Sequence, residues 1–502
     1  MTSRSAHLAI DLGAESGRAM LGLLHEGKVT LHEMHRFPNQ PLRLPDGWHW
    51  DVGSLWKHIT RGLECAAQWS RTQEVKLCSV GVDTWGVDFA LLGRSGEMLT
   101  LPRCYRDERF ARAQRTVHER LDGKVLYGVT GIQDLPFNTL FQLASMQEHE
   151  PGLLGAARSL VFMPDLFHYL LSGKAVQERT IASTSQMLDA RTGMWRTDLL
   201  EQLSIPHYYL GTLSDAPTQL EGIRPALREE LGLPEGVMVI APAGHDTACA
   251  VAAVPAASDQ DWCYLSSGTW SLLGAELREP CLTDSARAAG FTNERGLGGS
   301  VRFLKNIAGL WVLQECRRSW ESQGVVSSYE DLVRLATEAP ACRTLIDVSR
   351  PEFLAPGAMP ERIIGFARAT NQPLPDCPAA FARCIFDSLA LAYRQAFTDL
   401  QEVLGRRFGT IHLVGGGSRN RLLNQMTADA TGCRVLAGPS EATALGNMLI
   451  QAIGCGLVSD LASLRGLVRD TTACESYVPA DTAQWREAAD RLNRFTVPAT
   501  IS

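Results

Sequence analysis

The sequence lacks an excess of positive charge. Its 48 Lys and Arg residues stand against 55 Asp and Glu residues, which gives a net charge of −7 and a pI near 6.0. A nucleic-acid binder needs a basic face, so this balance argues against that class of protein. It does not exclude phosphate ligands, because backbone amides can bind them locally.

The sequence also lacks a long apolar run and closely paired cysteines. The most apolar late segment, 444–458, is interrupted by Asn447 and Gln451 and is shorter than a bilayer crossing requires. The first residues lead into an Asp-containing strand instead of the apolar core of a signal peptide. None of the 13 cysteines forms a C-x-x-C pair. We therefore expect a cytoplasmic protein with reduced thiols, no zinc site and no membrane partner.

Two familiar nucleotide motifs are missing. No Gly-Lys pair is followed by the Ser or Thr of a Walker A motif. The run Gly415-Gly416-Gly417 follows a strand, but position 420 is Asn where a dinucleotide fingerprint has its third glycine. The next strand, 433–436, ends without the acid that binds a ribose. This pattern counts against NAD.

The most informative segment present is 7–18, which reads as a strand, a glycine-bracketed turn and a second strand. Asp11 stands where the first strand ends, and Gly13 and Gly17 bracket the turn. We expect these glycines to adopt positive φ, so that backbone N–H groups converge on an anion. Asp11 either caps its own turn or faces metal-bound phosphates through water. Glu15 must then point away from the phosphates.

The same strand–turn–strand style recurs later in the chain. Segment 264–274 predicts a hairpin with a hydroxyl-rich turn. Segment 411–420 predicts a strand that enters the glycine triplet, with Ser418 as the N-cap of a helix over 419–431. In the N-terminal part of the chain we also expect a strand over 75–82, with 87–92 as its hairpin partner. These features indicate a duplicated architecture whose halves face one nucleotide.

The length of 502 residues suits two domains. Strands and helices alternate, so the fold class is α/β. The pattern changes between residues 244 and 260, and we place the boundary so that the domains cover 1–245 and 246–502.

The run His245-Asp246-Thr247 follows a predicted buried strand over 237–240. An Asp here can orient a sugar hydroxyl and accept its proton, because a loose phosphoryl-transfer transition state needs only late proton removal. Asp246 can equally serve as the N-cap of the helix that follows. The two roles are compatible.

The segment 83–88 predicts a ligand-facing turn. A carbohydrate needs an apolar plate for its C–H face and hydrogen-bonding groups for its hydroxyls. Trp85 supplies the plate and Gly86 a close backbone approach. Asp83, Asp88 and Arg106 are polar candidates, and each of them alone is as compatible with a structural role.

Taken together, these motifs resemble a known family. The segments Asp-Leu-Gly-Ala-Glu-Ser-Gly-Arg, Gly-Val-Asp-Thr-Trp-Gly-Val-Asp-Phe, Pro-Phe-Asn-Thr-Leu, His-Asp-Thr-Ala, Leu-Ser-Ser-Gly-Thr-Trp-Ser and Val-Gly-Gly-Gly-Ser occur here in the order and spacing of the FGGY carbohydrate kinases, within the actin-like ATPase superfamily. The match runs from about residue 7 to 478. The second and third of these segments favour the rhamnulose kinases over glycerol or xylulose kinases.

The resemblance implies two ribonuclease-H-like domains with mixed sheets flanked by helices, and an active site in the cleft between them. It implies transfer of the ATP γ-phosphate to O1 of L-rhamnulose with Mg²⁺, by a monomer or small homo-oligomer. Asp246 would be the proton acceptor and Asp11 the metal contact through water. Sugar contacts would be Gly86, His245, Asp246, Thr247 and Asn306, to which the residue pattern of the ligand-facing turn adds Trp85 and Arg106. ATP contacts would be Ala14, Glu15, Ser16, Gly17, Arg18, Thr269, Gln314 and Gly416.

Two alternatives stay open. One is a kinase for a neighbouring sugar such as L-fuculose or L-xylulose, because one methyl group or stereocentre is worth only ~1–3 kcal/mol of discrimination. The other is an actin-like ATPase that uses nucleotide closure to bind a protein partner. Asp246 near Trp85 and Gly86 favours a small polyol, whereas no protein-binding surface stands out in the sequence.

Overall fold

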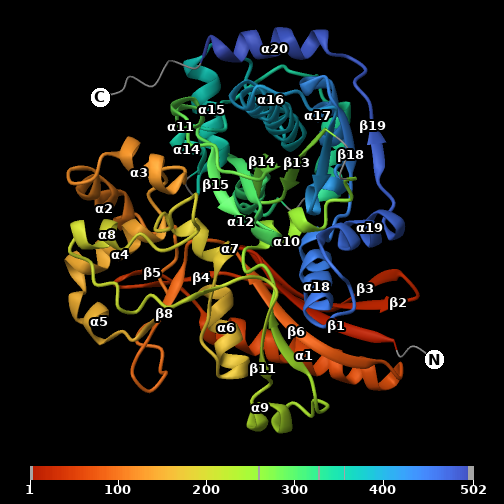
Figure 1. Cartoon of the computed structure of the whole chain (residues 1–502). Helices are drawn as coiled ribbons and strands as arrows, with labels where there is room; N and C mark the ends of the chain where they lie inside the picture. Colours follow the sequence, from red (N-terminus) through yellow and green to blue (C-terminus); the bar gives the residue numbers. More distant parts are fainter. Residues whose placement is uncertain (1–3, 258–260, 326–327, 355–356, 496–502) are drawn as a thin grey trace. The chain divides into compact units, whose positions relative to one another are not determined.

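The computed structural model describes residues 4–257, 261–325, 328–354 and 357–495. The chain forms two compact units (Figure 1). Unit 1 comprises Met1–Ser258, Glu276–Phe303 and Ala442–Thr472, and unit 2 comprises Asp259–Ala275, Leu304–Glu441 and Ala473–Ser502. Each unit is therefore assembled from segments that are far apart in the sequence.

A six-stranded mixed sheet forms the centre of unit 1. β1 and β2 pair antiparallel as predicted, whereas β6 and β12 run parallel to β1. The strand order is β11 (Thr218–Gly222), β12 (Met238–Ala241), β6 (Lys76–Thr84), β1 (Ser5–Leu12), β2 (Ser16–His25) and β3 (Lys28–Pro38).

The two faces of this sheet are covered by different helices because side chains alternate along each strand. Val80 and Val82 share an apolar cluster with α1 (Val52–Thr72) and α6 (Met163–Ser172). The residues that alternate with them along β6, such as Ser79, face α18 (Ala442–Gly454), where Gln451 accepts the Ser79 hydroxyl at 2.6 Å. The apolar residues Leu55, Ile59 and Leu63 recur with helical spacing along α1 and are buried.

Smaller elements complete unit 1. Short two-stranded sheets are formed by β4 (Pro41–Leu44) with β5 (Gly47–Trp50), β7 (Phe89–Leu92) with β8 (Ser159–Phe162), and β9 (Gln177–Glu178) with β10 (Leu213–Ser214). The remaining helices are α2 (Arg109–His118), α3 (Gly123–Thr130), α4 (Thr139–His149), α5 (Pro151–Ala156), α7 (Arg179–Ala182), α8 (Thr197–Gln202), α9 (Pro225–Glu230), α10 (Asp246–Ala252), α11 (Asp284–Ala288) and α19 (Leu461–Thr471), with 3₁₀ turns at Ser183–Ser185 and Leu297–Gly299.

One predicted hairpin is wrong. The segment 87–92 does not pair with β6; its strand β7 pairs antiparallel with β8 instead. The chain turns away after β6 because Val87 adopts a left-handed conformation with φ of 69°. A bulky β-branched residue takes this conformation only where its surroundings fix it. Here the Val87 N–H donates to the Thr184 hydroxyl at 3.0 Å, which holds the turn.

The second sheet has seven strands, in the order β15 (Thr292–Arg295), β16 (Val301–Ala308), β14 (Trp270–Leu277), β13 (Trp262–Ser267), β17 (Thr410–Val414), β18 (Arg434–Ala437) and β19 (Glu475–Tyr477). Helices of unit 2 are α12 (Trp311–Ser322), α13 (Tyr329–Glu338), α14 (Pro351–Leu354), α15 (Met359–Ala369), α16 (Pro378–Leu404), α17 (Arg421–Thr431) and α20 (Ala483–Asn493). The long α16 packs against α13 and α17. Figure 1 labels α16 and α17.

The duplication predicted from the sequence is visible in the pairing pattern. In the first sheet, a hairpin β1–β2 is followed by parallel β6 and β12 and then by antiparallel β11. In the second, the hairpin β13–β14 is followed by parallel β17 and β18 and then by antiparallel β19. The turns at 12–16 and 267–270 therefore occupy equivalent places in their sheets.

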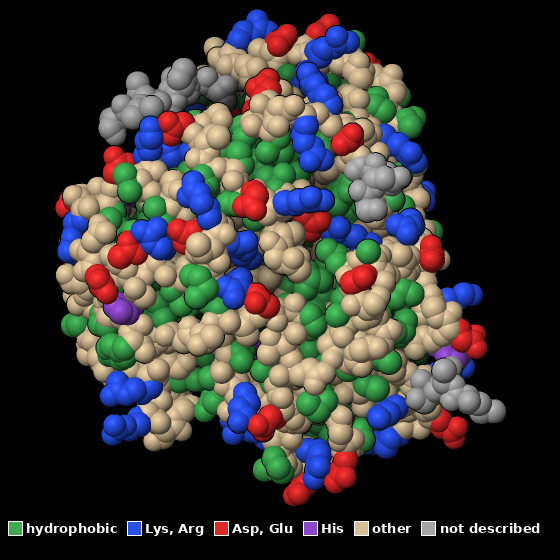
Figure 2. Space-filling view, in the orientation of Figure 1, with side chains coloured by type: hydrophobic (Ala, Val, Ile, Leu, Met, Phe, Trp, Pro, Cys, Tyr) green, Lys and Arg blue, Asp and Glu red, His purple; other side chains and the backbone are tan. Residues whose placement is uncertain are grey.

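The described surface is mixed in charge. On the face drawn in Figure 2, basic and acidic side chains of the described residues are interspersed instead of gathering by sign. None of the helices in the described part of the chain combines the length with the apolar composition that a bilayer crossing requires.

Candidate active site

Three aspartates of unit 1 are placed at one edge of the first sheet. β1, β6 and β12 are parallel, and Asp11 is in register with Asp83 on the neighbouring strand. Thr84 N–H donates to the Gly244 carbonyl at 2.9 Å, which aligns the end of β6 with the segment that leads to Asp246. The carboxyl ends of parallel strands are where open α/β sheets bind ligands. The first sheet thus brings Asp11, Asp83 and Asp246 to its ligand-binding edge.

Asp11 is held by an arginine of the next strand. Arg18 Nε donates to Asp11 Oδ2 at 2.8 Å, and Arg18 Nη2 lies 2.6 Å from the same oxygen. The pair follows directly from the β1–β2 register, which sets these two residues opposite each other. Asp11 therefore makes an ion pair across the hairpin instead of the turn cap that was the alternative.

The turn after Asp11 is shaped differently from the prediction. Neither Gly13 nor Gly17 has positive φ. Gly17 is instead required for close packing, because a Cβ there would collide with the ring of Phe37 on β3. The turn is closed by Gly13 N–H donating to the Ser16 carbonyl at 3.0 Å. Asn39, which the sequence did not single out, braces it by donating its amide to the Gly13 carbonyl at 2.8 Å.

Asp83 is a fully buried carboxyl in this group. Burial and the neighbouring Asp11 raise its pKa well above the usual range, against the opposing hydrogen bond from Asn447. That bond, from Asn447 Nδ2 to Asp83 Oδ2, is 2.5 Å long. Asp83 Oδ1 is buried without a hydrogen-bond partner among the described residues. The neutral acid is the form that this environment favours.

Asp246 is the first residue of α10, so the helix cap is His245 and not Asp246. Its carboxylate accepts the Thr247 N–H at 2.5 Å and the Thr247 hydroxyl at 3.0 Å, and its side chain is 27% exposed. Burial raises the pKa of Asp246, His245 opposes this rise, and Asp11 adds to it. A carboxylate with a raised pKa is a better proton acceptor near neutral pH than an ordinary aspartate.

Trp85 lies beside these carboxylates, because its N–H donates to the Leu12 carbonyl at 3.2 Å. Its indole N–H donates to Asp88 at 2.9 Å, and Asp88 also accepts the indole N–H of Trp50 at 2.6 Å. The centroids of the two indoles are 4.1 Å apart. Asp88 therefore fixes both rings, and its burial raises its own pKa to about 6.

Gly86 and Arg106 take positions that the sequence did not define. A Cβ on Gly86 would point at Thr184, 3.2 Å away, and not into open space. Arg106 Nη2 lies 3.7 Å from Glu15 Oε1, and its guanidinium carbon lies 5.4 Å from the Tyr105 ring centroid. Arg106 thus reaches the turn that follows Asp11, and Glu15 is directed towards this arginine.

In unit 2 the equivalent turn and the glycine triplet converge. Gly415 has a φ of 85°, and a Cβ there would lie 3.0 Å from the Ser267 carbonyl oxygen. A Cβ on Gly417 would collide with the Ser267 side chain. Trp311 N–H donates to the Thr269 carbonyl at 3.1 Å, which ties the same turn to the start of α12. These contacts require glycine at positions 415 and 417.

The predicted ATP contacts of unit 2 lie around this convergence. Thr269 is in the turn, Gly416 is exposed with open space around its Cα, and Gln314 is on α12. Gln314 Oε1 is a buried acceptor without a hydrogen-bond partner among the described residues. Asn306 lies on β16, one residue after Lys305.

The predicted N-cap at Ser418 is wrong. The glycine triplet continues into a 3₁₀ turn, Gly416–Arg419, and α17 begins only at Arg421. Its cap is Asn420, whose side chain accepts the Leu423 N–H at 3.0 Å. The Asn that replaces the third glycine of a dinucleotide fingerprint thus has a structural role of its own.

Metal ligation by protein side chains alone is limited. No group of three or more His, Cys, Asp or Glu that could hold a metal ion occurs among the described residues. Mg²⁺ usually keeps several waters and takes one or two carboxylates plus phosphate oxygens. The Asp11 carboxylate is an oxygen donor of that type, and the neighbouring Asp83 Oδ1 is a buried acid oxygen without a hydrogen-bond partner among the described residues. The residues present therefore fit a hydrated Mg²⁺, not an all-protein cage.

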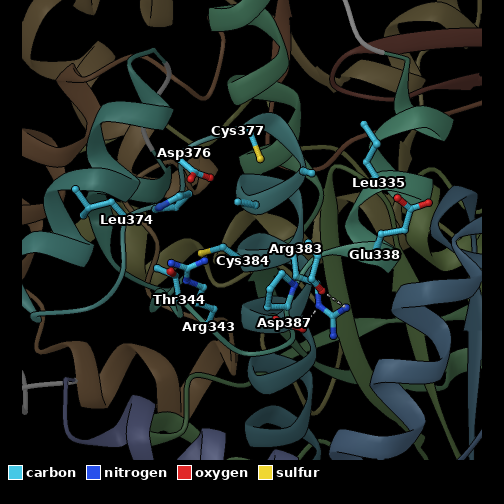
Figure 3. Close-up of a pocket in the computed structure, with 15 residues that line it drawn as sticks. Leu335, Glu338, Arg343, Thr344, Leu374, Asp376, Cys377, Arg383, Cys384 and Asp387 are labelled. Carbon is cyan, nitrogen blue, oxygen red and sulfur yellow. Dashed lines mark hydrogen bonds and ion pairs between the residues drawn. The ribbon is translucent and has the colours of Figure 1, made fainter.

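Unit 2 also has a separate cavity of about 260 Å³ (Figure 3). It lies beside the start of α16, where Arg383 Nε donates to Asp387 Oδ1 at 3.0 Å. None of the predicted site residues is among the residues that line it. The cavity is therefore a feature apart from the predicted site.

Comparison with known proteins agrees with this geometry. The model of the FGGY family of carbohydrate kinases, N-terminal domain, matches residues 6–253, and the model of the C-terminal domain matches residues 263–455. A protein of Bacteroides thetaiotaomicron named rhamnulokinase is 42% identical over 96% of this chain and 97% of its own length. Proteins of the same name from Enterococcus faecalis and Klebsiella pneumoniae are each 41% identical, with 94% of both chains covered.

Solved structures show the same fold. A gluconate kinase from Lactobacillus acidophilus superimposes with a TM-score of 0.79 at 16% identity, covering 98% of this chain and 97% of its own. The Plasmodium falciparum glycerol kinase with ADP gives a TM-score of 0.76 at 12% identity, with coverage of 98% and 97%. The expected two-domain α/β fold with two mixed sheets is thereby confirmed. Both family models and the near full-length relatives agree, and the chain belongs to the FGGY family of carbohydrate kinases.

Proposed function

We propose that the chain transfers the γ-phosphate of ATP to O1 of L-rhamnulose, which gives L-rhamnulose 1-phosphate and ADP. Relatives that are 38–42% identical over 94–96% of the chain carry the name rhamnulokinase, which supports this sugar. A neighbouring ketose such as L-fuculose or L-xylulose is the nearest alternative, because a binding pocket distinguishes sugars that differ by one methyl group or stereocentre by only ~1–3 kcal/mol.

The observation that carries the proposal is the position of Asp246. Its partly exposed carboxylate stands at the same sheet edge as Asp11, which lies at the end of β1 just before the glycine-bracketed turn. We infer that Asp246 accepts the O1 proton while O1 bonds to the γ-phosphorus and the bond to the β-phosphate oxygen breaks. The raised pKa of Asp246, caused first by burial, suits a base that works near neutral pH.

We further propose how the domains share the substrates. The N-terminal domain, 1–245, carries the phosphate turn and the sugar contacts up to His245, and the C-terminal domain, 246–502, holds the nucleotide and completes the sugar site. The sugar contacts are Trp85, Gly86, Arg106, His245, Asp246, Thr247 and Asn306. The ATP contacts are Ala14, Glu15, Ser16, Gly17, Arg18, Thr269, Gln314 and Gly416.

Three further side chains assist binding of the phosphates and the sugar in this proposal. Arg18 neutralises part of the Asp11 charge next to the phosphates, as its 2.6 Å contact allows. Arg106 draws the Glu15 carboxylate towards itself, which reduces the repulsion between Glu15 and an anion. Trp85 offers a fixed indole as the apolar plate for the C–H face of a sugar.

Kinases of this family use ATP. We propose that Mg²⁺ accompanies it and that Asp11 contacts the ion through water. When bound, the ion would neutralise charge on the phosphate oxygens.

An ADP-release assay tests the proposal. Purified protein is incubated with ATP and Mg²⁺ and with L-rhamnulose, L-fuculose, L-xylulose, glycerol or no sugar. We expect the highest kcat/KM with L-rhamnulose and a 1-phosphate product by ³¹P NMR. A higher kcat/KM with another ketose would replace the sugar but keep the kinase, whereas ADP release unaffected by any sugar would favour an assembly ATPase.

A further inference from the structure

Behind His245 lies a buried ion pair that the sequence did not reveal. Arg302 on β16 is completely buried, and its Nη2 donates to Glu294 Oε2 on β15 at 2.9 Å. The Arg302 Nε donates to the Arg295 carbonyl at 3.1 Å, which fixes the guanidinium plane. Burial raises the pKa of Glu294, but Arg302 and His245 lower it to below its usual range. Glu294 is therefore a carboxylate at neutral pH.

This ion pair contacts one nitrogen of the His245 ring, and the catalytic candidate contacts the other. His245 Nδ1 lies 3.1 Å from Glu294 Oε2 and 3.0 Å from Arg302 Nη2. His245 Nε2 lies 3.3 Å from Asp246 Oδ1. The imidazole thus stands between a fixed ion pair and the carboxylate that we propose as the base.

The arrangement at Nδ1 is unusual because it offers both an acceptor and a donor. When Nδ1 carries a proton, it can donate to Glu294; when it does not, it can accept from Arg302. The ring therefore keeps a hydrogen-bond partner at Nδ1 in either tautomer and in the charged form. Its orientation, and hence the position of Nε2 against Asp246, does not depend on where the ring proton is.

Stability alone does not explain this pair well. A buried ion pair contributes little net stability compared with apolar residues of the same volume. Other charged groups near this segment act elsewhere: Glu178 accepts the Gly244 N–H at 2.9 Å, and Asp11 and Asp83 interact with Asp246 instead of the ring. Glu294 and Arg302 are the charged side chains for which a contact with the His245 ring nitrogen Nδ1 is found in the described structure.

We propose that Glu294 and Arg302 are positioning residues that hold the His245 imidazole against Asp246, so that the base and its neighbouring sugar contact stay correctly placed during phosphoryl transfer. The proposal rests on the proposed function, in which Asp246 accepts the sugar proton. Small misplacements of such groups are costly, since about 1 Å can reduce a rate by about 100-fold.

The test compares Glu294→Gln with a matched control, Glu276→Gln. Glu276 also accepts from an arginine of the same unit, Arg465 at 3.0 Å, but it does not contact His245. We expect Glu294→Gln to lower kcat at least tenfold and to leave the KM for ATP within twofold. The control should leave kcat within twofold even if it lowers the melting temperature by a similar amount.

A double variant separates positioning from general damage. In a His245→Asn background the ring is absent, so adding Glu294→Gln should change kcat by less than twofold. A further tenfold loss in that background, or wild-type kcat in Glu294→Gln alone, would overturn the proposal. Glu294→Asp, which keeps the charge but shortens the reach, replaces Glu294→Gln if the latter does not fold; it should also lower kcat.

A measurement without substrate keeps this proposal distinct from the proposed function. The ¹⁵N shifts of the His245 ring, identified by their loss in His245→Asn, report the protonation of Nδ1 and Nε2. We expect Glu294→Gln to change these shifts and Glu276→Gln to leave them unchanged. Unchanged shifts in Glu294→Gln would refute the positioning role, whether or not any sugar supports turnover.

Discussion

Replacing Asp88 by Asn should change how the stability of the protein depends on pH. Asp88 is buried and accepts the indole N–H groups of Trp50 and Trp85 and the side-chain amide of Gln142. Burial raises its pKa from 3.8 to about 6, against these hydrogen bonds. Because one pKa unit corresponds to about 1.4 kcal/mol, ionisation of Asp88 in the folded protein costs about 3 kcal/mol more than in the unfolded chain.

The sign follows from the direction of the pKa change. A raised folded-state pKa means that the stabilisation is complete below pH 3.8, where Asp88 is protonated in both states, and is lost as the pH rises through 6. Asn cannot ionise, so Asp88→Asn does not undergo this loss. Relative to wild type, its free energy of unfolding should therefore rise by about 2–3 kcal/mol between pH 4 and pH 7.5.

Asp88→Asn also changes the free energy of unfolding by an amount that does not depend on pH. The Asn oxygen can still accept from both indoles, but its NH₂ group meets the Gln142 NH₂ group. Gln142 must then turn its amide and give up its 2.9 Å bond to the Phe137 carbonyl, at a cost of about 1 kcal/mol. This cost does not depend on pH. Only the change of the stability difference with pH therefore tests the burial argument.

Urea unfolding followed by tryptophan fluorescence, at constant ionic strength and several pH values, measures this difference. Asp189→Asn is the matched control, because the hydrogen bonds to Asp189 lower its pKa in spite of its partial burial. Relative to wild type, its free energy of unfolding should fall only as the pH rises to the ordinary aspartate pKa of 3.8, and it should stay nearly constant over the range in which Asp88→Asn gains stability. A pH-independent difference between Asp88→Asn and wild type would refute the reasoning.

Three further outcomes are expected. The value of kcat/KM should fall as the pH falls through the raised pKa of Asp246, because the protonated acid cannot accept the sugar proton. The fall should begin at a pH above the ordinary aspartate pKa of 3.8. A kcat/KM that stays constant down to pH 4 would contradict this. Gly86→Val should raise the KM for the sugar about tenfold, because its side chain would press on Thr184, which lies 3.2 Å from the Cβ position. Gly86→Ala should raise this KM less. Variants with the wild-type KM would remove Gly86 from the site. Asn39→Ala should raise the KM for ATP several-fold by releasing the turn at Gly13, and an unchanged KM would show that the brace is dispensable.

The sequence was sufficient for the local features of the fold. The hairpin β1–β2, the helix α1 and the strand that leads to the glycine triplet are fixed by apolar periodicity and by turn residues, which act over short distances. The family assignment followed from the order of several such motifs. The duplicated pairing pattern could be proposed because both sheets start from the same kind of hairpin.

The wrong predictions arose where distant contacts decide a local conformation. The partner of β7 is β8, about 70 residues later in the chain, and periodicity gives no information about this pairing. Gly17 was interpreted as a residue with positive φ, but it is needed because Phe37 of another strand packs on it. Ser418 was displaced as a helix cap because the preceding glycines form a 3₁₀ turn.

The missed residues of the candidate site have the same cause. Glu294 and Arg302 lie in segments without any recognisable motif, and only the fold brings them to His245. Asn447 contacts Asp83 across 364 positions of the sequence. A charged residue inside an apolar strand, such as Arg302 between Val301 and Phe303, is the one signal that could have pointed to a buried partner.

The turnover of Asp246→Asn with L-rhamnulose and ATP tests the central claim most directly. The variant keeps the volume of the side chain but cannot accept a proton, so kcat should fall by about 10²–10⁴-fold while the Kd for ATP stays within a factor of two or three. A variant that binds ATP normally and turns over at the wild-type rate would contradict the claim that this carboxylate is the base.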